Sequence, residues 1–267
     1  MSLPDLTEAS LADLVSLEGR TAVITGGAAG IGAAIARRFD EAGAHVTIAD
    51  LDLAAAEKTA SELSRAAAVH LDASNSRQNI EVAEGVVEEH GRLDIWVNNA
   101  GIYPFVDLVD MTPEQWHTVI SLNLDGVFFG SRAAMRPMVA AGRGVIINLA
   151  STAAYGAEGG GIAHYTASKH GVRGFTKALA FELGPSGVRA VALAPTLVET
   201  PGTLADRDAI SAGMGVENAH DAFAEQIPAR RIGYPDDVAR VAYFLASDLA
   251  AFVSGDTILV DGGLRSR

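Results

Sequence analysis

The 267-residue chain contains no cysteine, and its acidic residues clearly outnumber its basic ones. Without cysteine it can form neither disulfides nor thiolate metal sites, which favours a reducing, cytoplasmic location. A formal net charge of -13 argues against binding to a nucleic-acid backbone, which would be repelled rather than neutralised. No apolar run approaches the roughly 20 residues of a membrane span, and the first residues lack the features of a signal peptide. The sequence therefore predicts no nucleic-acid partner and no membrane partner.

What the chain does contain is a regular alternation of β-rich and helical segments. Apolar, β-rich runs occur at 21–25, 45–49, 67–71, 93–97, 144–149, 189–193 and 257–260. Longer segments of helical period lie between them, including 30–42, 53–64, 76–90 and 112–140. Strand and helix in alternation, joined by short glycine-rich turns, predict an α/β fold with a parallel sheet covered on both faces.

We find no linker, internal repeat or low-complexity tract, so residues 20–267 are expected to form a single domain. Residues 1–19 carry several leucines among acidic residues, which predicts a short amphipathic arm that is either packed on the body or loose. Residues 201–231, where glycines alternate with polar residues, are predicted to form a substrate lid between the sixth strand and the last helix.

The first predicted strand leads into a glycine-rich turn at residues 25–32. Gly26, Gly30 and Gly32 allow a tight turn, close approach of the backbone to a pyrophosphate, and packing of the next helix on the strand. The helix that opens at Gly30 and Ile31 offers free N–H groups and the positive end of its dipole to a phosphate. The spacing Gly-x-x-x-Gly-x-Gly is thus typical of a dinucleotide-binding loop.

Polar residues then follow the next strands at their carboxyl ends. Asp50 ends the second strand roughly 20 residues after the loop, where a carboxylate can accept hydrogen bonds from the adenosine ribose hydroxyls. The alternative is that Asp50 merely caps the next helix. Asp72 ends the third strand and is expected near the adenine. The neighbouring residues predicted to contact the dinucleotide are Leu51, Ala73, Asn99, Ala100 and Gly101.

Tyr165 and Lys169 are four residues apart, so on a helix they lie on one face, one turn apart. A fixed ammonium near a phenol favours the phenolate, which suits the phenol to acid–base catalysis near neutrality. Taken alone, the pair also fits a half-exposed helix face. The dinucleotide-binding pattern upstream favours the catalytic interpretation.

Together these motifs resemble the short-chain dehydrogenase/reductase family over nearly all of residues 17–263. The resemblance implies that Asn123, Ser151, Tyr165 and Lys169 are catalytic, with Thr152 as a minor alternative to Ser151 because the gap to Tyr165 is slightly longer than usual. It implies a doubly wound Rossmann-type sheet of seven parallel strands, NAD(P) as cofactor, and a homotetramer or homodimer. Asn123 would hold a water that relays protons, and Lys169 would also bind the nicotinamide ribose.

The chain departs from the family pattern after the sixth strand, where Pro195-Thr196 replaces the family's Pro-Gly beside the nicotinamide. Thr200 remains placed to bind the carboxamide of that ring, and Val198 belongs to the same predicted segment. The seven histidines show no metal-ligand spacing, so no catalytic metal is expected. His164 is either structural or pocket-lining. The candidates for an apolar substrate pocket, or else for ordinary core, are Ile102, Tyr103, Pro104, Phe105, Tyr155, Leu197, Met214 and Phe223.

These features predict an NAD-dependent alcohol dehydrogenase or ketone reductase acting on a small to medium, mainly apolar secondary alcohol. A 3-oxoacyl carrier-protein or acyl-CoA reductase is the alternative within the class, and the net charge disfavours its acidic partner. The basic residues that could dock such a partner are Arg132, Arg136, Arg143 and Arg173. A non-catalytic cofactor-binding protein is disfavoured, because all four catalytic positions are filled.

Overall fold

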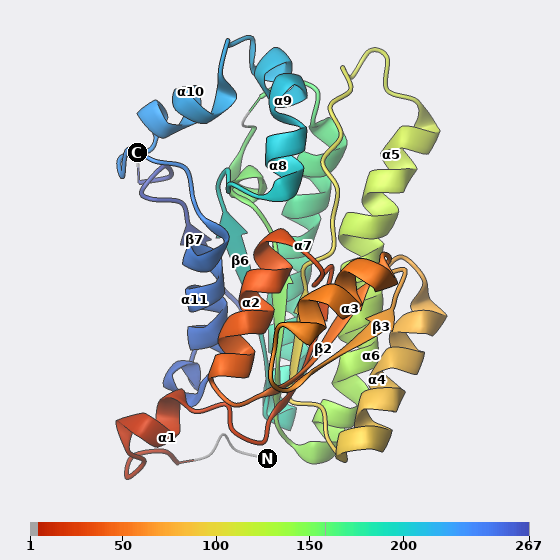
Figure 1. Ribbon diagram of the computed structural model, residues 1–267, viewed down its shortest axis with the longest axis vertical. Coiled ribbons are helices and arrows are strands. Elements are labelled where there is room, and N and C mark those ends of the chain that lie inside the picture. The colour runs from red at the N-terminus through yellow and green to blue at the C-terminus, as the bar shows by residue number, and fades with distance from the viewer. Residues whose placement is uncertain (1–4, 158, 267) are drawn as a thin grey trace.

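The computed structural model describes residues 5–157 and 159–266, and its centre is one parallel sheet (Figure 1). The order of the strands is β3-β2-β1-β4-β5-β6-β7, which confirms the predicted doubly wound, seven-stranded fold. The strands are β1 (Thr21–Thr25), β2 (His45–Asp50), β3 (Ala66–His70), β4 (Ile95–Asn98), β5 (Gly144–Leu149), β6 (Val188–Pro195) and β7 (Thr257–Val260). The order reverses between β1 and β4, and in such sheets the ligand crevice lies at the carboxyl ends beside this reversal.

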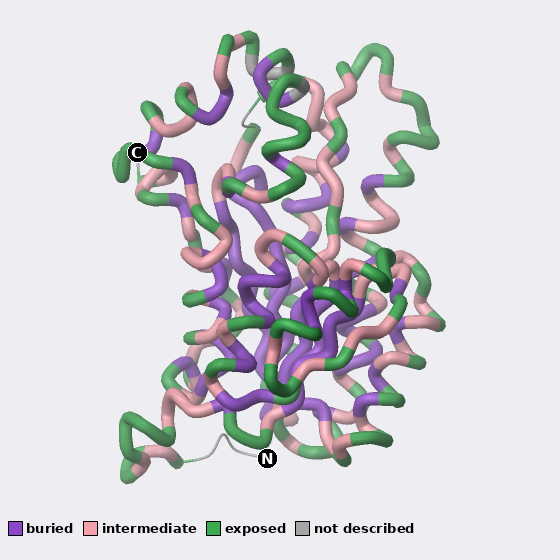
Figure 2. The backbone as a smooth tube through the Cα atoms, viewed as in Figure 1, coloured by how far each residue is buried: buried purple, intermediate pink, exposed green. Residues whose placement is uncertain are grey.

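Helices cover both faces of the sheet, so the strands are buried on both sides (Figure 2). The helices are α1 (Leu11–Val15), α2 (Gly30–Glu41), α3 (Leu53–Ser61), α4 (Ser76–His90), α5 (Pro113–Ile120), α6 (Gly126–Ala141), α7 (Ala163–Leu183), α8 (Pro201–Ala205), α9 (Arg207–Met214), α10 (Ala219–Gln226) and α11 (Pro235–Ala246). Successive strand residues point to opposite faces. Ile24 therefore packs with α2, α3 and α11, while its neighbour Val23 packs with α4, α6 and α7.

The segment predicted as one helix over 112–140 is interrupted by a π-helical turn, Ser121–Asp125, between α5 and α6. Such a turn inserts an extra residue into the helical ladder and is frequent at functional sites. Here it contains the predicted catalytic residue Asn123, whose side chain is completely buried. The periodicity over 112–140 did not reveal the turn, because one inserted residue changes only the phase of the apolar face and leaves the spacing within each helix helical.

The described part of the N-terminal arm packs on the body. Leu17 is completely buried in the core, and the hydroxyl of Tyr243 on α11 donates a hydrogen bond to the carbonyl oxygen of Val15. Of the two arrangements that the sequence left open, the packed one is therefore present. The division into an arm and one domain stays a prediction.

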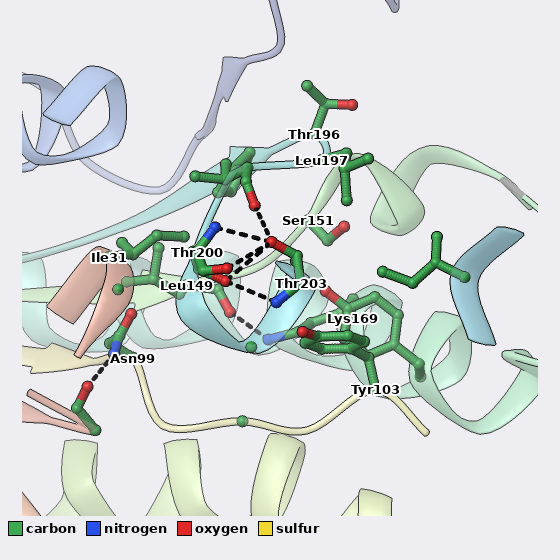
Figure 3. Close-up of a pocket in the computed structure, with 18 of the residues that line it drawn as sticks. Ile31, Asn99, Tyr103, Leu149, Ser151, Lys169, Thr196, Leu197, Thr200 and Thr203 are labelled. Carbon is green, nitrogen blue, oxygen red and sulfur yellow. Dashed lines mark hydrogen bonds between the residues drawn. The ribbon is translucent and has the colours of Figure 1, made fainter. Parts of the chain in front are cut away.

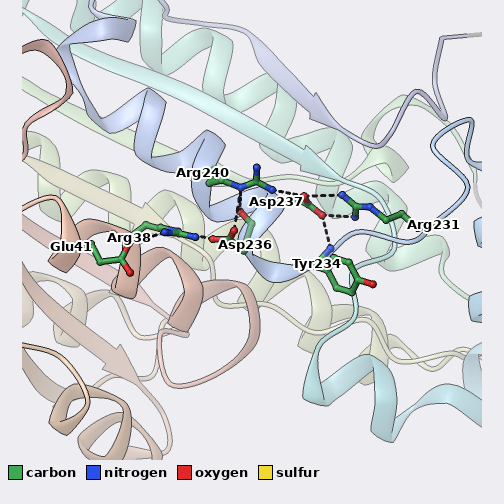
Figure 4. A network of polar contacts seen from close by, with 7 residues as sticks. All are labelled: Arg38, Glu41, Arg231, Tyr234, Asp236, Asp237 and Arg240. Atoms are coloured by element: carbon green, nitrogen blue, oxygen red, sulfur yellow. Dashed lines mark hydrogen bonds and ion pairs between the residues drawn. The ribbon is translucent and has the colours of Figure 1, made fainter. Parts of the chain in front are cut away.

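A network of ion pairs joins the end of α2 to the start of α11 (Figure 4). Arg38 on α2 binds Asp236 at 2.6 Å, and Asp237 accepts hydrogen bonds from both Arg231 and Arg240. The arginine hydrogen bonds hold the pKa values of Asp236 and Asp237 below their usual range. The network fixes the segment before α11, which is the far end of the predicted lid.

Three short helices, α8, α9 and α10, occupy the predicted lid and lie beyond the carboxyl ends of the strands (Figure 1). They follow β6 directly, so the chain leaves the sheet at the crevice and returns to it through α11. Across the described residues, no helix combines the length and the apolar character that a membrane span requires.

Candidate active site

A cavity of about 390 Å³ lies at the carboxyl ends of the strands, between the glycine-rich turn and the lid helices. Most predicted site residues meet in its wall: Gly26, Gly30, Ile31, Asn99, Ala100, Gly101, Ser151, Tyr165, Lys169, Pro195, Thr196, Val198 and Thr200. The predicted residues outside the wall are Gly32, Asp50, Leu51, Asp72, Ala73 and Asn123. Segments separated by more than a hundred residues in the sequence therefore form one site.

The glycine-rich turn has the shape of a phosphate cradle. Gly26 has a φ of +62°, and a Cβ added at Gly32 would overlap the carbonyl oxygen of Gly26 and come within 2.9 Å of the Cα of Gly27. Ala29 precedes α2 and offers no side-chain cap, so the first N–H groups of the helix remain open to an anion. These residues fit the pyrophosphate of a dinucleotide.

Asn99 holds this turn against the end of β4. Its Nδ2 donates to the carbonyl oxygen of Thr25 at 3.0 Å and to that of Gly26 at 2.8 Å. Figure 3 shows Asn99 at this edge of the cavity. The hydroxyl oxygen of Thr25 in turn accepts hydrogen bonds from the N–H groups of Asn99 and Ala100. The cradle is thus shaped before any ligand enters, which limits the ordering cost of binding.

Asp50 is oriented by two backbone groups, and it does not cap the following helix. One carboxylate oxygen accepts from the N–H of Ala28 at 3.0 Å, and the other from the N–H of Asp52 at 3.1 Å. Asp52 itself caps α3 by accepting from the N–H of Ala55. The capping alternative for Asp50 is therefore wrong, and its carboxylate lies beside the glycine-rich turn.

Asp72 shapes the turn that follows β3. Its Oδ1 accepts from both the N–H and the hydroxyl of Ser74, and its own N–H donates to Oε1 of Gln78 at 2.8 Å. The carbonyl oxygen of Ala73 accepts from Nδ2 of Asn79. These contacts are local, so the expected contacts of Asp72 and Ala73 with adenine stay predictions.

The structure gives the neighbouring residues Ser151 and Thr152 different surroundings. Ser151 lies in the cavity wall, where its Oγ accepts from the N–H of Ala153 at 3.1 Å. Thr152 is completely buried, lies outside the wall, and donates to the carbonyl oxygen of Pro195 at 3.2 Å. The geometry favours Ser151 as the residue that can reach a substrate, and its catalytic role stays a prediction.

Tyr165 and Lys169 lie on the cavity face of α7, one turn apart. The Nζ of Lys169 is 5.5 Å from the centre of the Tyr165 ring and donates to the carbonyl oxygen of Leu149 at 2.7 Å (Figure 3). Burial lowers the pKa of Lys169 to about 8. The ammonium is therefore fixed beside the phenol, in the arrangement that favours acid–base chemistry.

Asn123 acts on the loop that follows β4. Its Oδ1 accepts from the N–H of Ile102 at 2.9 Å, and its Nδ2 donates to the carbonyl oxygen of the same residue at 2.8 Å. The amide thus holds the backbone of that loop in place beside Gly101. This positioning contact has no signal in the sequence, and the predicted role in holding a water stays a prediction.

The segment after β6 contains an unusual polar atom. The Oγ1 of Thr196 is buried and has no hydrogen-bond partner among the described residues. Buried hydroxyls are normally satisfied, so this atom is available to a ligand or a water that binds beside it. The Oγ1 of Thr200 accepts from the N–H of Thr203 and caps α8 (Figure 3).

The far half of the cavity wall is mainly apolar. Of the predicted pocket residues, Tyr103, Phe105, Leu197 and Phe223 lie in the wall, whereas Ile102, Pro104 and Tyr155 do not. The side chain of Met214 lies outside the described residues. Sequence reasoning gave no pocket role to Leu149, Ala150 or Ile162, and it placed Pro201, Gly202, Thr203 and Ile210 only within the predicted lid. Only the amphipathic pattern of the lid helices could have suggested the apolar members of that set.

His164 is structural rather than pocket-lining. It is completely buried, is absent from the cavity wall, and its Nδ1 accepts from the N–H of Tyr165 at 2.9 Å. Burial lowers its pKa, so the ring stays neutral near pH 7. Among the described residues, no group of three or more His, Asp or Glu is arranged to hold a metal ion.

The sheet reversal, the phosphate cradle and the cavity define a dinucleotide-binding α/β protein. A family model described as enoyl-(acyl carrier protein) reductase matches residues 26–265. D-threitol dehydrogenase from Mycolicibacterium smegmatis is 38% identical over 251 residues, which cover 92% of this chain and 93% of that protein.

Two solved structures extend the comparison. A short-chain type dehydrogenase/reductase from Mycobacterium marinum aligns with a TM-score of 0.88 and 32% identity over 97% of this chain and 100% of its own. A gluconate 5-dehydrogenase from Burkholderia cenocepacia, in complex with NADP and tartrate, aligns with a TM-score of 0.88 and 35% identity over the same shares. The chain belongs to the short-chain dehydrogenase/reductase family and is an oxidoreductase, which confirms the resemblance noted in its sequence.

Proposed function

We propose that this oxidoreductase interconverts a secondary alcohol and a ketone, with NAD(H) as its cofactor. The observation that carries the proposal is the shared cavity: Ser151, Tyr165 and Lys169 border the same space as a glycine cradle open to phosphate. A relative that acts on an alcohol, D-threitol dehydrogenase, supports it. The substrate is expected to be uncharged, since the far wall of the cavity is mainly apolar.

The roles of the residues follow from the charge that a carbonyl oxygen develops during reduction. Tyr165 donates a proton to that oxygen, and takes it back when an alcohol is oxidised. Ser151 donates a hydrogen bond to the same oxygen and stabilises its developing charge. The buried ammonium of Lys169 stabilises the phenolate that Tyr165 leaves behind. The dinucleotide, when bound, supplies or accepts the hydride.

The chain's own residues would hold the dinucleotide at its pyrophosphate and at its nicotinamide end. The first N–H groups of α2 would bind the pyrophosphate, and Lys169 would bind the nicotinamide ribose. Pro195, Thr196 and Thr200 would border the nicotinamide, and the unsatisfied Oγ1 of Thr196 is a candidate partner for it. NAD is preferred through Asp50, because no Arg or Lys stands beside it at positions 28–29 or 51–52.

The direct test is a panel of ketones and secondary alcohols followed by NADH absorbance, with wild type and Tyr165→Phe side by side. We expect turnover by the wild type and none by the variant, with NADH affinity changed only a few-fold, because the phenol moves the proton but contributes little to holding the dinucleotide. A variant that retains more than about a tenth of the wild-type rate would assign the acid to another group.

One observation supports the alternative of a carrier-protein substrate: the matching family model is described as enoyl-(acyl carrier protein) reductase. Two of the four arginines that could dock an acidic carrier are already engaged. Arg143 binds Asp94 at 3.0 Å, and Arg173 lies over the ring of Tyr155 at 4.1 Å. Turnover of a 3-oxoacyl thioester at a rate above that of simple ketones would favour this alternative. A homotetramer or homodimer and a cytoplasmic location belong to the main proposal.

A further inference from the structure

Tyr103 places a second phenol in the cavity, opposite the one proposed to be catalytic. It belongs to the loop after β4, and its ring meets that of Tyr165 edge-on with 6.3 Å between the ring centres. Figure 3 labels Tyr103 among the side chains that line this cavity, together with Lys169 and Thr203. The loop that carries it is held by the two hydrogen bonds between Asn123 and Ile102.

The hydroxyl of Tyr103 has space around it and no hydrogen-bond partner in the part of the chain that the structure describes. Among the hydrogen bonds of the described residues, none involves this hydroxyl, although its ring is half-buried. The closest approach of the lid is at Gly202 on α8, where an added Cβ would come 3.1 Å from the Tyr103 oxygen. The absence of a side chain at Gly202 therefore keeps the space beside this oxygen open.

Other polar side chains in this part of the wall already have partners. The Oγ1 of Thr203 donates to the carbonyl oxygen of Val198 at 2.8 Å, and the Oγ1 of Thr200 accepts from the N–H of Thr203. Apart from the proposed catalytic groups, Tyr103 is thus the side chain in the mainly apolar half of the described wall that can form a hydrogen bond with a substrate.

The electrostatic surroundings select a neutral partner for this hydroxyl. Burial, and the negative charge of Asp206 at the end of α8, raise the pKa of Tyr103, so it remains a hydrogen-bond donor at neutral and mildly alkaline pH. Among the described residues of the cavity wall, Lys169 is the sole cation. A carboxylate or phosphate bound at Tyr103 would face the negative charge of Asp206, and Lys169 is already assigned to the Tyr165 phenolate and the nicotinamide ribose.

We propose that Tyr103 binds a second, uncharged oxygen of the substrate, so that the preferred substrates are ketones with a neighbouring hydroxyl and the corresponding diols. The proposal rests on the proposed function and narrows its substrate class. Both phenols border the same cavity and their ring centres are 6.3 Å apart, so a small substrate with oxygens on adjacent carbon atoms could contact both side chains. Tyr165 takes the reacting oxygen, and Tyr103 takes its neighbour.

The test compares ketones that differ only by that hydroxyl. Acetoin is paired with butanone, and phenylacetylcarbinol with phenylacetone, and kcat/KM is measured for each. We expect wild type to favour the hydroxy ketone of each pair by roughly tenfold, since a site built for a hydroxyl discriminates against the analogue without it. Tyr103→Phe should bring both ratios to within about twofold of one. The matched control is Tyr234→Phe, a half-exposed tyrosine outside the cavity, which should keep the wild-type ratios.

Gly202→Ala provides a second variant that leaves Tyr103 itself intact. Its added methyl group crowds the Tyr103 oxygen, so we expect it to lower the same ratios, and it keeps the proposal testable if Tyr103→Phe fails to fold. A wild-type ratio near one, or the wild-type ratio retained in both variants, overturns the role of Tyr103 and leaves the proposed function standing. No turnover of any of the four ketones with either dinucleotide overturns the proposed function and this inference with it.

Discussion

Ser151 and Thr152 are adjacent hydroxyl residues of which only one faces the cavity, and this difference can be measured. We expect Ser151→Ala to lower kcat/KM on the order of 10²-fold, the usual cost of losing one donor to a developing oxyanion. Thr152→Ala is the matched control and should cost much less, because its hydroxyl is bonded to the carbonyl oxygen of Pro195. Steady-state kinetics on one ketone compare the two variants. If Thr152→Ala were the more damaging, the assignment of the serine would be wrong.

Asp50 is the residue predicted to make the enzyme prefer NAD to NADP. Its carboxylate can accept from both adenosine ribose hydroxyls, whereas NADP replaces one hydroxyl with a phosphate that carries about -1.5 to -2 charges. We expect kcat/KM to favour NAD on the order of 10²–10³, or about 3–4 kcal/mol. Asp50→Ser combined with Leu51→Arg should reduce or reverse the preference.

The control for this experiment is Asp52→Asn, which retains a side chain able to cap α3 and removes only the charge. It should keep most of the preference for NAD, because Asp50 remains. Equal efficiency of the two cofactors in the wild type, within about threefold, would contradict the role given to Asp50.

At the scale of elements, α7 packs so closely that it buries an ammonium, and this predicts a pH dependence of stability. Lys169 is 5% exposed, and its pKa falls to about 8 in the fold, against 10.5 in an unperturbed lysine. Between these two values the unfolded chain binds more protons than the folded one, so the free energy of unfolding increases as the pH rises through that window. The increase is at most about 3 kcal/mol, at 1.36 kcal/mol per pKa unit.

The measurement is denaturant unfolding of the cofactor-free protein at several pH values, for wild type and Lys169→Met. The variant lacks the titrating group, so the difference between the two curves isolates Lys169 from the other residues that titrate in this range. We expect wild type to gain stability relative to the variant from pH 8 upward. Parallel curves would show that Lys169 keeps an ordinary pKa in the fold.

At the scale of the whole molecule, the predicted oligomer needs an apolar surface that the subunit itself leaves uncovered. Val172 and Leu179 on α7 are buried within the subunit, so they do not provide it. Two aromatic residues of α6 and α7 are exposed: Phe181 on α7 is 89% exposed, and Phe128 on α6 is 44% exposed. Large exposed aromatic side chains on neighbouring helices are typical of an interface between proteins.

We therefore expect light scattering at micromolar concentration to give the mass of a homotetramer, or at least of a dimer. Phe181→Asp should shift the distribution to smaller species, because association would bury its charge. Arg77→Asp is a suitable control, since Arg77 lies on α4 with an exposed side chain that pairs only at the surface. A wild-type mass equal to one chain would rule out the oligomer at that concentration.

Local patterns in the sequence were sufficient for most of the fold and for most of the cavity wall. Alternation of β-rich and helical segments predicted every strand, with ends displaced by at most two residues, because strand burial and helix period are properties of short stretches. The glycine-rich turn and the Tyr165–Lys169 pair were recognisable for the same reason: their chemistry depends on residues close together in the chain.

Tertiary structure decided what depends on contacts between distant segments. It placed the amide of Asn123 on the backbone of Ile102, freed Asp50 from capping α3, and buried Val172 and Leu179 inside the subunit. It also brought Tyr103 beside Gly202, nearly a hundred residues further along the chain. Periodicity says which face of a helix is apolar but not which segment covers it. That choice depends on how all the helices pack on the sheet at once.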